Sequence, residues 1–381
     1  MSVEEPEAGI ERVLSEIERQ KDSEVLQNLQ QNKSTLQRQL NNIRDPIAGL
    51  PVEISSEIST LCLPSYLPKQ ATANQVPTLL LRICNTWSGI ALATPALWAS
   101  FLIRFPCRTG LNVVWERWLQ RSGTHPLHIR VLGPLESQAG ALIWRHSNRL
   151  QRLGILPELQ VQGVELDHRD RDILAGTQPQ SLPCLRTLSI AGCQRSTFLQ
   201  LPILRLLRLA PVLTELILYN LLLSHAQEEV ETLAGVVLPC LRRLTVARFS
   251  NRLGSNDPTQ YILDYISAPG LEIFICDSPA DYPKLLSFLR RSEASIQDIC
   301  IREMQNFSGM DELLPLIPSV TRVKFEWNRA QAVEQLFTTL EQRLALPSLR
   351  NLQVQWSQCR EPPNAFWEAV LRALFDRRTQ L

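Results

Sequence analysis

The chain has 381 residues, 44% of them hydrophobic and 20% charged, which is the composition of a folded protein rather than a disordered one. Its 39 Lys and Arg against 38 Asp and Glu give a net charge of +1, so we expect neither nucleic acid nor an anionic membrane as a partner. No apolar run is long enough to span a membrane, and the acidic first residues, Met1 to Gly9, do not have the pattern of a secretory signal.

The first segment, residues 1–44, is expected to contain one amphipathic helix. Residues 10–44 include no Pro or Gly and are rich in good helix formers. Its apolar seam has two open interpretations, a short coiled coil and a helix that docks on its own chain. The residues that fall on a and d positions of one heptad phase are Leu26, Leu29, Leu36, Leu40 and Ile43.

A small helical module is expected over residues 45–105. Asp45-Pro46 ends the preceding helix, because a residue before proline avoids the helical region. Pro51 suits the first turn of the next helix, and Glu53 suits the positive end of its dipole. A second helix is predicted over residues 78–93, and Thr94-Pro95 breaks it.

Four short motifs in this module carry a family resemblance. They are Leu-Pro-x-Glu-Ile at 50–54, Cys-Leu-Pro at 62–64, Ile-Cys-x-x-Trp at 83–87 and Thr-Pro-x-Leu-Trp at 94–98. Together they resemble the F-box-like domain of mushroom-forming fungi. Trp-Leu-x-Arg-Ser-Gly at 118–123, leading to Pro126-Leu127, is similar to that family's entry into its repeats. Ser59 stands where the family usually has a bulky apolar residue.

The resemblance implies a partner for the module. In the family, the module docks on a Skp-type adaptor, which connects it to a cullin-based ubiquitin ligase. A module of this size gains stability by burying apolar helix faces on such a partner. The alternative for Cys84, Trp87 and Trp98 is a place in the core of the module. The residues that the resemblance assigns to adaptor binding are Leu50, Pro51, Ile54, Ile58, Ile83, Cys84 and Trp87.

The third segment, residues 106–381, contains a repeated pattern, Leu-x-x-Leu-x-aliphatic. Alternation at the end of each copy is typical of a strand, and helical patterns lie between copies. Self-similarity at such steps predicts an irregular leucine-rich repeat solenoid, a curved α/β horseshoe. The alternative is an ordinary α/β domain with Leu-rich strands. The copies start at Leu150, Leu185, Leu213, Leu241, Leu271, Ile296, Val320 and Leu349.

The alternation divides the strand residues between two faces. We expect the inward face to bear Leu188, Leu216, Leu244, Ile299, Val323 and Leu352. The residues between them would line the concave face, where an apolar centre beside a basic cluster favours a protein target with an acidic, partly apolar segment. The alternative is that a loop or the N-terminal helix covers Ile273 and Ile275. The expected target-binding residues are Ile217, Tyr219, Arg243, Ile273, Ile275, Arg302, Arg322 and Lys324.

No motif for catalysis, metal or cofactor emerges. His168-Arg169-Asp170 matches the start of a kinase catalytic loop, but Ala175 occupies the position of its Asn. The nine Cys include no Cys-x-x-Cys, and an odd count favours reduced thiols in the cytoplasm or nucleus. The resemblance therefore implies a substrate receptor of a ubiquitin ligase, and the absence of catalytic motifs predicts that it has no chemistry of its own. The alternative is a scaffold protein whose adaptor site is degenerate, as Ser59 would allow.

Overall fold

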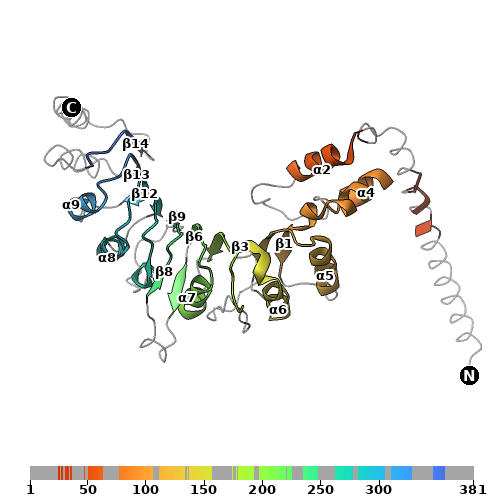
Figure 1. Ribbon diagram of the computed structural model, residues 1–381, viewed down its shortest axis with the longest axis horizontal. Coiled ribbons are helices and arrows are strands. Elements are labelled where there is room, and N and C mark those ends of the chain that lie inside the picture. The colour runs from red at the N-terminus through yellow and green to blue at the C-terminus, as the bar shows by residue number, and fades with distance from the viewer. Residues whose placement is uncertain are drawn as a thin grey trace, which may run out of the picture. The chain divides into compact units, whose positions relative to one another are not determined.

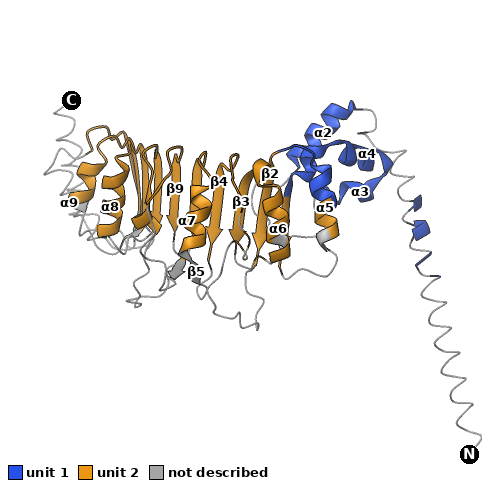
Figure 2. Cartoon of the chain, turned by 60° about the horizontal axis from the view of Figure 1, so that its bottom comes forward, with its two compact units in different colours: residues 1–100, 117–125 blue, residues 101–116, 126–381 orange. Residues whose placement is uncertain are grey.

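In the computed structural model, the chain forms two compact units (Figure 2). Unit 1 comprises residues 1–100 and 117–125, and unit 2 comprises residues 101–116 and 126–381. The structure describes residues 50–62, 77–105, 111–133, 137–156, 179–192, 197–219, 221–224, 235–247, 262–277, 282–304, 310–327 and 346–356, with isolated positions between 25 and 47 and at 135, 174 and 177.

The N-terminal helix is described only in part. The described positions between Val25 and Leu36 are helical, and both of these apolar side chains are exposed. The other residues of the expected heptad seam, Leu26, Leu29, Leu40 and Ile43, lie outside the described residues. In the parts of the chain that the structure covers, no helix has the length and apolar character needed to cross a bilayer.

Unit 1 is helical in its described residues. It contains α2 (Val52–Leu61), α3 (Leu80–Ile83), α4 (Asn85–Ala93), a 3₁₀ turn (Pro95–Trp98) and the end of α5 (Leu111–Arg121). Its core consists of Leu80, Ala91, Leu97 and Trp98, against which Leu81, Ile83, Trp87 and Trp118 pack.

Trp98 is the centre of this core. Its side chain is fully buried, and its indole Nε1–H donates to the carbonyl of Ala91 at 2.7 Å. Trp118 meets it edge to face at 5.3 Å between ring centroids, and the guanidinium of Arg121 lies 4.5 Å from the Trp98 ring centroid. Both partners come from α5, so residues beyond the expected boundary at 105 complete the core of unit 1.

Unit 2 is built on a ten-stranded parallel sheet whose strand order follows the chain. The ten strands are β1 (Ser100–Arg104), β2 (Leu127–Leu132), β3 (Leu150–Leu156), β4 (Thr187–Ala191), β6 (Glu215–Tyr219), β9 (Arg243–Ala247), β11 (Ile273–Asp277), β12 (Asp298–Met304), β13 (Arg322–Trp327) and β14 (Asn351–Trp356). Two small parallel pairs accompany them: β5 (Thr197–Leu199) with β7 (Leu222–Ser224), and β8 (Val236–Val237) with β10 (Ile266–Ser267).

All eight sequence repeats lie on consecutive strands of this sheet, which confirms the predicted strands. Their second apolar residues are paired in register from β3 to β14, so one row of side chains crosses eight strands. That row is Leu153, Leu188, Leu216, Leu244, Phe274, Ile299, Val323 and Leu352.

Helices cover one face of the sheet. These are α6 (Ser137–Arg145), α7 (Gln200–Arg208), α8 (Tyr282–Ser292) and α9 (Met310–Leu313), which Figures 1 and 2 show along the same side of the strands. The rings of Phe274 on β11 and Phe288 on α8 lie 6.0 Å apart, so the in-register row faces this helical layer. The five predicted inward residues from Leu188 to Val323 are at most 2% exposed, whereas Leu352 on the edge strand β14 is half-buried.

A proline turn leads into most of these strands. In six turns the residue before proline accepts a hydrogen bond from the N–H three positions later, at 3.1–3.2 Å. Proline at the second position suits such turns because its φ is already fixed there. The third position is Cys184, Val212, Cys240, Gly270, Ser319 or Ser348. Gly270 is required at its turn, because a Cβ there would lie 2.6 Å from the carbonyl oxygen of Pro239.

Leu216→Ala should lower the free energy of unfolding of unit 2 by about 2–5 kcal/mol, because Leu216 is fully buried between the sheet and the helices. Thermal and denaturant unfolding would measure the change. Ile217→Ala is the matched control, since Ile217 is the next residue on β6 and is only half-buried on the other face. Equal losses in both variants would contradict the assignment of faces.

Trp118→Ala should loosen unit 1 selectively, because it removes the edge-to-face partner of Trp98 and opens a cavity that costs about 3–5 kcal/mol. Hydrogen exchange of α4 amides would rise, while amides of β6 and β9 would keep their protection. Val114→Ala on the same helix is the control, because Val114 is exposed. Unchanged exchange in α4 would show that α5 does not complete this core.

Candidate binding surfaces

Helix α2 has an unusual distribution of polar and apolar residues. Ser55 and Ser59 are its buried residues, at 1% and 2% exposed. Their hydroxyls donate to carbonyls four residues earlier, Ser55 to Pro51 at 3.2 Å and Ser59 to Ser55 at 2.7 Å. The two serines thus satisfy their own polar groups, which removes the cost of burying them. Their small size allows α2 to pack closely inside unit 1.

The apolar residues of α2 point outward instead. Ile54, Ile58 and Leu61 fall within about 60° of arc on the helix, at 100° per residue. Their exposed fractions are 45%, 38% and 78%. Together with the adjoining Leu50 and Pro51, which are also exposed, they form what we call the α2 surface.

The structure divides the residues expected to bind the adaptor. Leu50, Pro51, Ile54 and Ile58 lie on the α2 surface. Ile83 and Trp87 are partly buried and pack against the core of unit 1. Cys84 is 1% exposed, which corrects its assignment to the adaptor surface, because a thiol inside the core cannot contact a partner.

Ser59 also has a different place from the one expected. It faces into unit 1 rather than toward a partner, so it leaves no gap in the α2 surface. Leu61 belongs to the α2 surface as well, although the family resemblance does not assign it to adaptor binding. The helical spacing of Leu61 from Ile54 and Ile58 was the signal that could have identified it.

The second candidate surface is the face of the sheet opposite the helices, which we call the open face. At its centre, strand pairing places Ile217, Thr245, Ile275 and Cys300 side by side on β6, β9, β11 and β12. Thr245 and Cys300 are 6% and 7% exposed, while the larger isoleucines between and beside them are half-buried. The expected apolar centre therefore exists, and Ile273 and Tyr219 are half-buried on the same strands.

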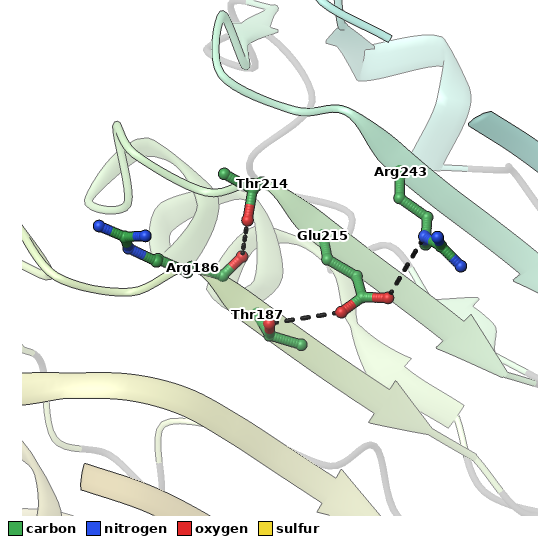
Figure 3. Close-up of polar contacts among 5 residues, drawn as sticks. All are labelled: Arg186, Thr187, Thr214, Glu215 and Arg243. Carbon is green, nitrogen blue, oxygen red and sulfur yellow. Dashed lines mark hydrogen bonds and ion pairs between the residues drawn. The ribbon is translucent and has the colours of Figure 1, made fainter. Parts of the chain in front are cut away.

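Two ion pairs connect neighbouring strands on the open face. Glu215 on β6 accepts from Thr187 Oγ1 at 3.4 Å and lies 3.7 Å from Arg243 Nε on β9 (Figure 3). Farther along, Arg322 on β13 lies 3.1 Å from a carboxylate oxygen of Asp298 on β12. Arg243 and Arg322 are thus both balanced by a carboxylate of the preceding strand.

This pairing modifies the basic cluster that the sequence predicts. Arg302, Arg322 and Lys324 do lie on the adjacent strands β12 and β13, where Arg302 pairs with Glu326 and Lys324 with Cys300 in the strand register. Because Asp298 is beside Arg322, the group is a mixed-charge rim rather than a uniformly basic patch.

The described residues include three of the chain's five histidines. They contain no group of three or more His, Cys, Asp or Glu that could hold a metal ion. His128 on β2 is hydrogen-bonded to Gln151 at 2.9 Å, and His125 is exposed. Burial, followed by the charges of Arg149 and Arg145, lowers the pKa of His146, so it is neutral at pH 7. The His168-Arg169-Asp170 motif lies outside the described residues.

A double-mutant cycle on Asp298 and Arg322 should give a coupling energy below about 1 kcal/mol, because the Arg322 side chain is 63% exposed and solvent screens the pair. The free energies of unfolding of the Asp298→Ala, Arg322→Ala and double variants would give this coupling energy. The coupling should shrink further in 1 M salt, where the screening length is about 3 Å. A larger, salt-insensitive value would mean that Arg322 is locked and unable to turn to a partner.

Comparison with known proteins assigns neither a family nor a function to the chain. No protein-family model matches the chain, and no curated protein matches it significantly. Its function must therefore be argued from the α2 surface, the open face and the residues that build them.

Proposed function

We propose that the chain is the substrate-receptor subunit of a Skp–cullin–F-box ubiquitin ligase, with no chemistry of its own. The α2 surface would bind the Skp-type adaptor, and the open face would bind a protein target. The observation that carries this proposal is the outward apolar stripe of Ile54, Ile58 and Leu61 on a helix whose buried residues are serines.

The energetics of α2 favour a partner. A ten-residue helix is marginal by itself, so its stability depends on packing. Its inward face contributes two buried serines and a hydrogen bond of 2.8 Å between the hydroxyls of Ser56 and Thr94, whereas its apolar side chains stay in water. Covering apolar area on a partner contributes about 25 cal/mol per Å², which is the stabilisation that this helix lacks alone. A cluster of exposed apolar residues on one helix face is typical of an interaction site.

The architecture of unit 2 supports the other half of the proposal. Parallel strands in chain order, similar turns and a helical layer on one face are what a leucine-rich repeat solenoid would have. Such an array leaves its other sheet face free for a target. On the open face, Tyr219 and the central isoleucines provide apolar area, and the ion-paired arginines provide a polar rim.

In this proposal the receptor accelerates ubiquitin transfer by proximity. It would hold a target lysine near the charging enzyme and so raise the effective concentration of the two reacting groups. The proposed role therefore needs no nucleophile, metal or cofactor on this chain. The receptor would contribute only the binding energy of its two surfaces.

Purified full-length chain should capture a purified fungal Skp-type adaptor, and Ile54→Asp with Ile58→Asp should weaken that binding by roughly 100-fold or more. The reason is that two carboxylates would have to be buried without partners. Calorimetry or biolayer interferometry would measure the affinity. Val237→Asp is the matched control, because Val237 is an apolar residue of unit 2 that is 62% exposed.

Two outcomes would count against the proposal. Capture of the adaptor by the double variant at wild-type affinity would place the adaptor site elsewhere. Absence of capture by the wild-type chain would favour the alternative, a scaffold protein without a working adaptor site. Ser59 does not support that alternative, because it is buried in unit 1 rather than missing from the α2 surface.

A further inference from the structure

A groove of about 540 Å³ lies at the amino ends of the strands, in unit 2. Its volume falls within the range of about 300–1,000 Å³ that ligand sites occupy. It is separate from the centre of the open face, because its lining comes from the turns and from the residue directly before each strand. Those residues precede β4, β6, β9, β11 and β12 and are Arg186, Thr214, Arg242, Glu272 and Gln297.

The carbonyl oxygens directly before the strands of this groove are already used within the sheet. The carbonyl oxygen of each residue that precedes a strand accepts two N–H groups from the start of the next strand, at 2.8–3.0 Å. Arg186, for example, accepts from Thr214 and Glu215 and also from the Thr214 hydroxyl. A carbonyl oxygen has two lone pairs, so these positions are saturated. A ligand at these five positions must therefore bind through side chains.

The side chains that remain are predominantly donors. Arg242 forms an ion pair with Glu272, which occupies the one carboxylate of the lining. Arg186 is exposed and has no ion pair within the described part of the chain. Figure 3 shows its guanidinium directed away from the row formed by Thr187, Glu215 and Arg243. The groove thus offers an uncompensated cation with five N–H donors, which suits a carboxylate.

The groove also has an apolar side. Val212 is 37% exposed, and Pro239, Cys240 and Pro269 are exposed in the neighbouring turns. A nucleic acid would need several cations for its phosphates and aromatic rings for its bases. The lining has one uncompensated arginine and no aromatic residue. An acidic polypeptide with apolar side chains fits this combination better.

We propose that this groove binds a short, extended segment of a partner protein that carries both acidic and apolar residues. Five strand starts at about 4.8 Å spacing span about 19 Å, which matches roughly six extended residues at 3.3 Å each. A carboxylate of the segment pairs with Arg186, and an apolar side chain covers Val212 and the adjoining prolines. The site does not depend on adaptor binding, because every lining residue belongs to unit 2.

The test is selection of a displayed library of random hexapeptides on immobilised full-length chain, followed by affinity measurement of the enriched synthetic peptides. Enriched peptides should contain Asp or Glu together with an apolar residue. Arg186→Glu should weaken their binding at least tenfold. Arg350→Glu is the matched control, because Arg350 is an exposed arginine directly before β14 and lies outside the groove, and it should leave the affinity unchanged.

Several results would overturn the proposal. These are the absence of any enriched peptide, enrichment of peptides without acidic residues, and equal effects of Arg186→Glu and Arg350→Glu. Binding of a twelve-residue oligothymidylate that requires Arg186 would assign the groove to nucleic acid instead. Adaptor capture by the Arg186→Glu variant, measured in parallel, separates failure of this site from failure of the α2 surface.

Discussion

The sheet of unit 2 depends on one recurring hydrogen-bond arrangement at the start of its strands. A carbonyl just before one strand accepts two successive N–H groups from the beginning of the next. This fixes both the spacing and the register of each new strand relative to the previous one. The apolar row from Leu153 to Leu352 is aligned because the register is the same at every step. Burial of that row and exposure of the opposite row both follow from this alignment.

The same arrangement explains where side chains are free to bind. Backbone groups at the strand starts are already used, so recognition there falls to arginine, serine and glutamine side chains. On the open face the backbone is used in the sheet itself, and the larger side chains stand over smaller neighbours such as Thr245 and Cys300. Both surfaces of unit 2 are therefore defined by the side chains that the common register places side by side.

The strands were the part of the structure most predictable from the sequence. A strand has a side-chain period of two, and eight copies in one phase leave little ambiguity about which residues are buried. The helix α2 was less predictable, because pattern reasoning assumes that apolar residues face the core of their own unit. In α2 that assumption fails for Ser55 and Ser59, whose hydroxyls are satisfied within the helix itself. Cys84 was misassigned for a related reason, since a motif gives residue types but not the direction of each side chain.

Contacts between residues far apart in the chain could not be predicted from the sequence. No local pattern indicates that Trp118 and Arg121 would meet Trp98, because the pairing depends on how the chain returns after β1. The ion pairs of Arg243 and Arg322 likewise depend on strand register, which brings residues 24 to 28 positions apart into contact. These contacts place a carboxylate beside Arg243 and beside Arg322, so the rim of the open face carries both charges.

Gly270 shows that the repeats, although similar, are not interchangeable parts. Five other turns have Cys, Val or Ser at the corresponding position, whereas here the carbonyl of Pro239 occupies the space that a side chain would need. A repeat transplanted from elsewhere in the array would bring a Cβ into that space and push the two turns apart. A gain or loss of whole repeats at this junction would therefore have to keep a glycine where the two turns meet.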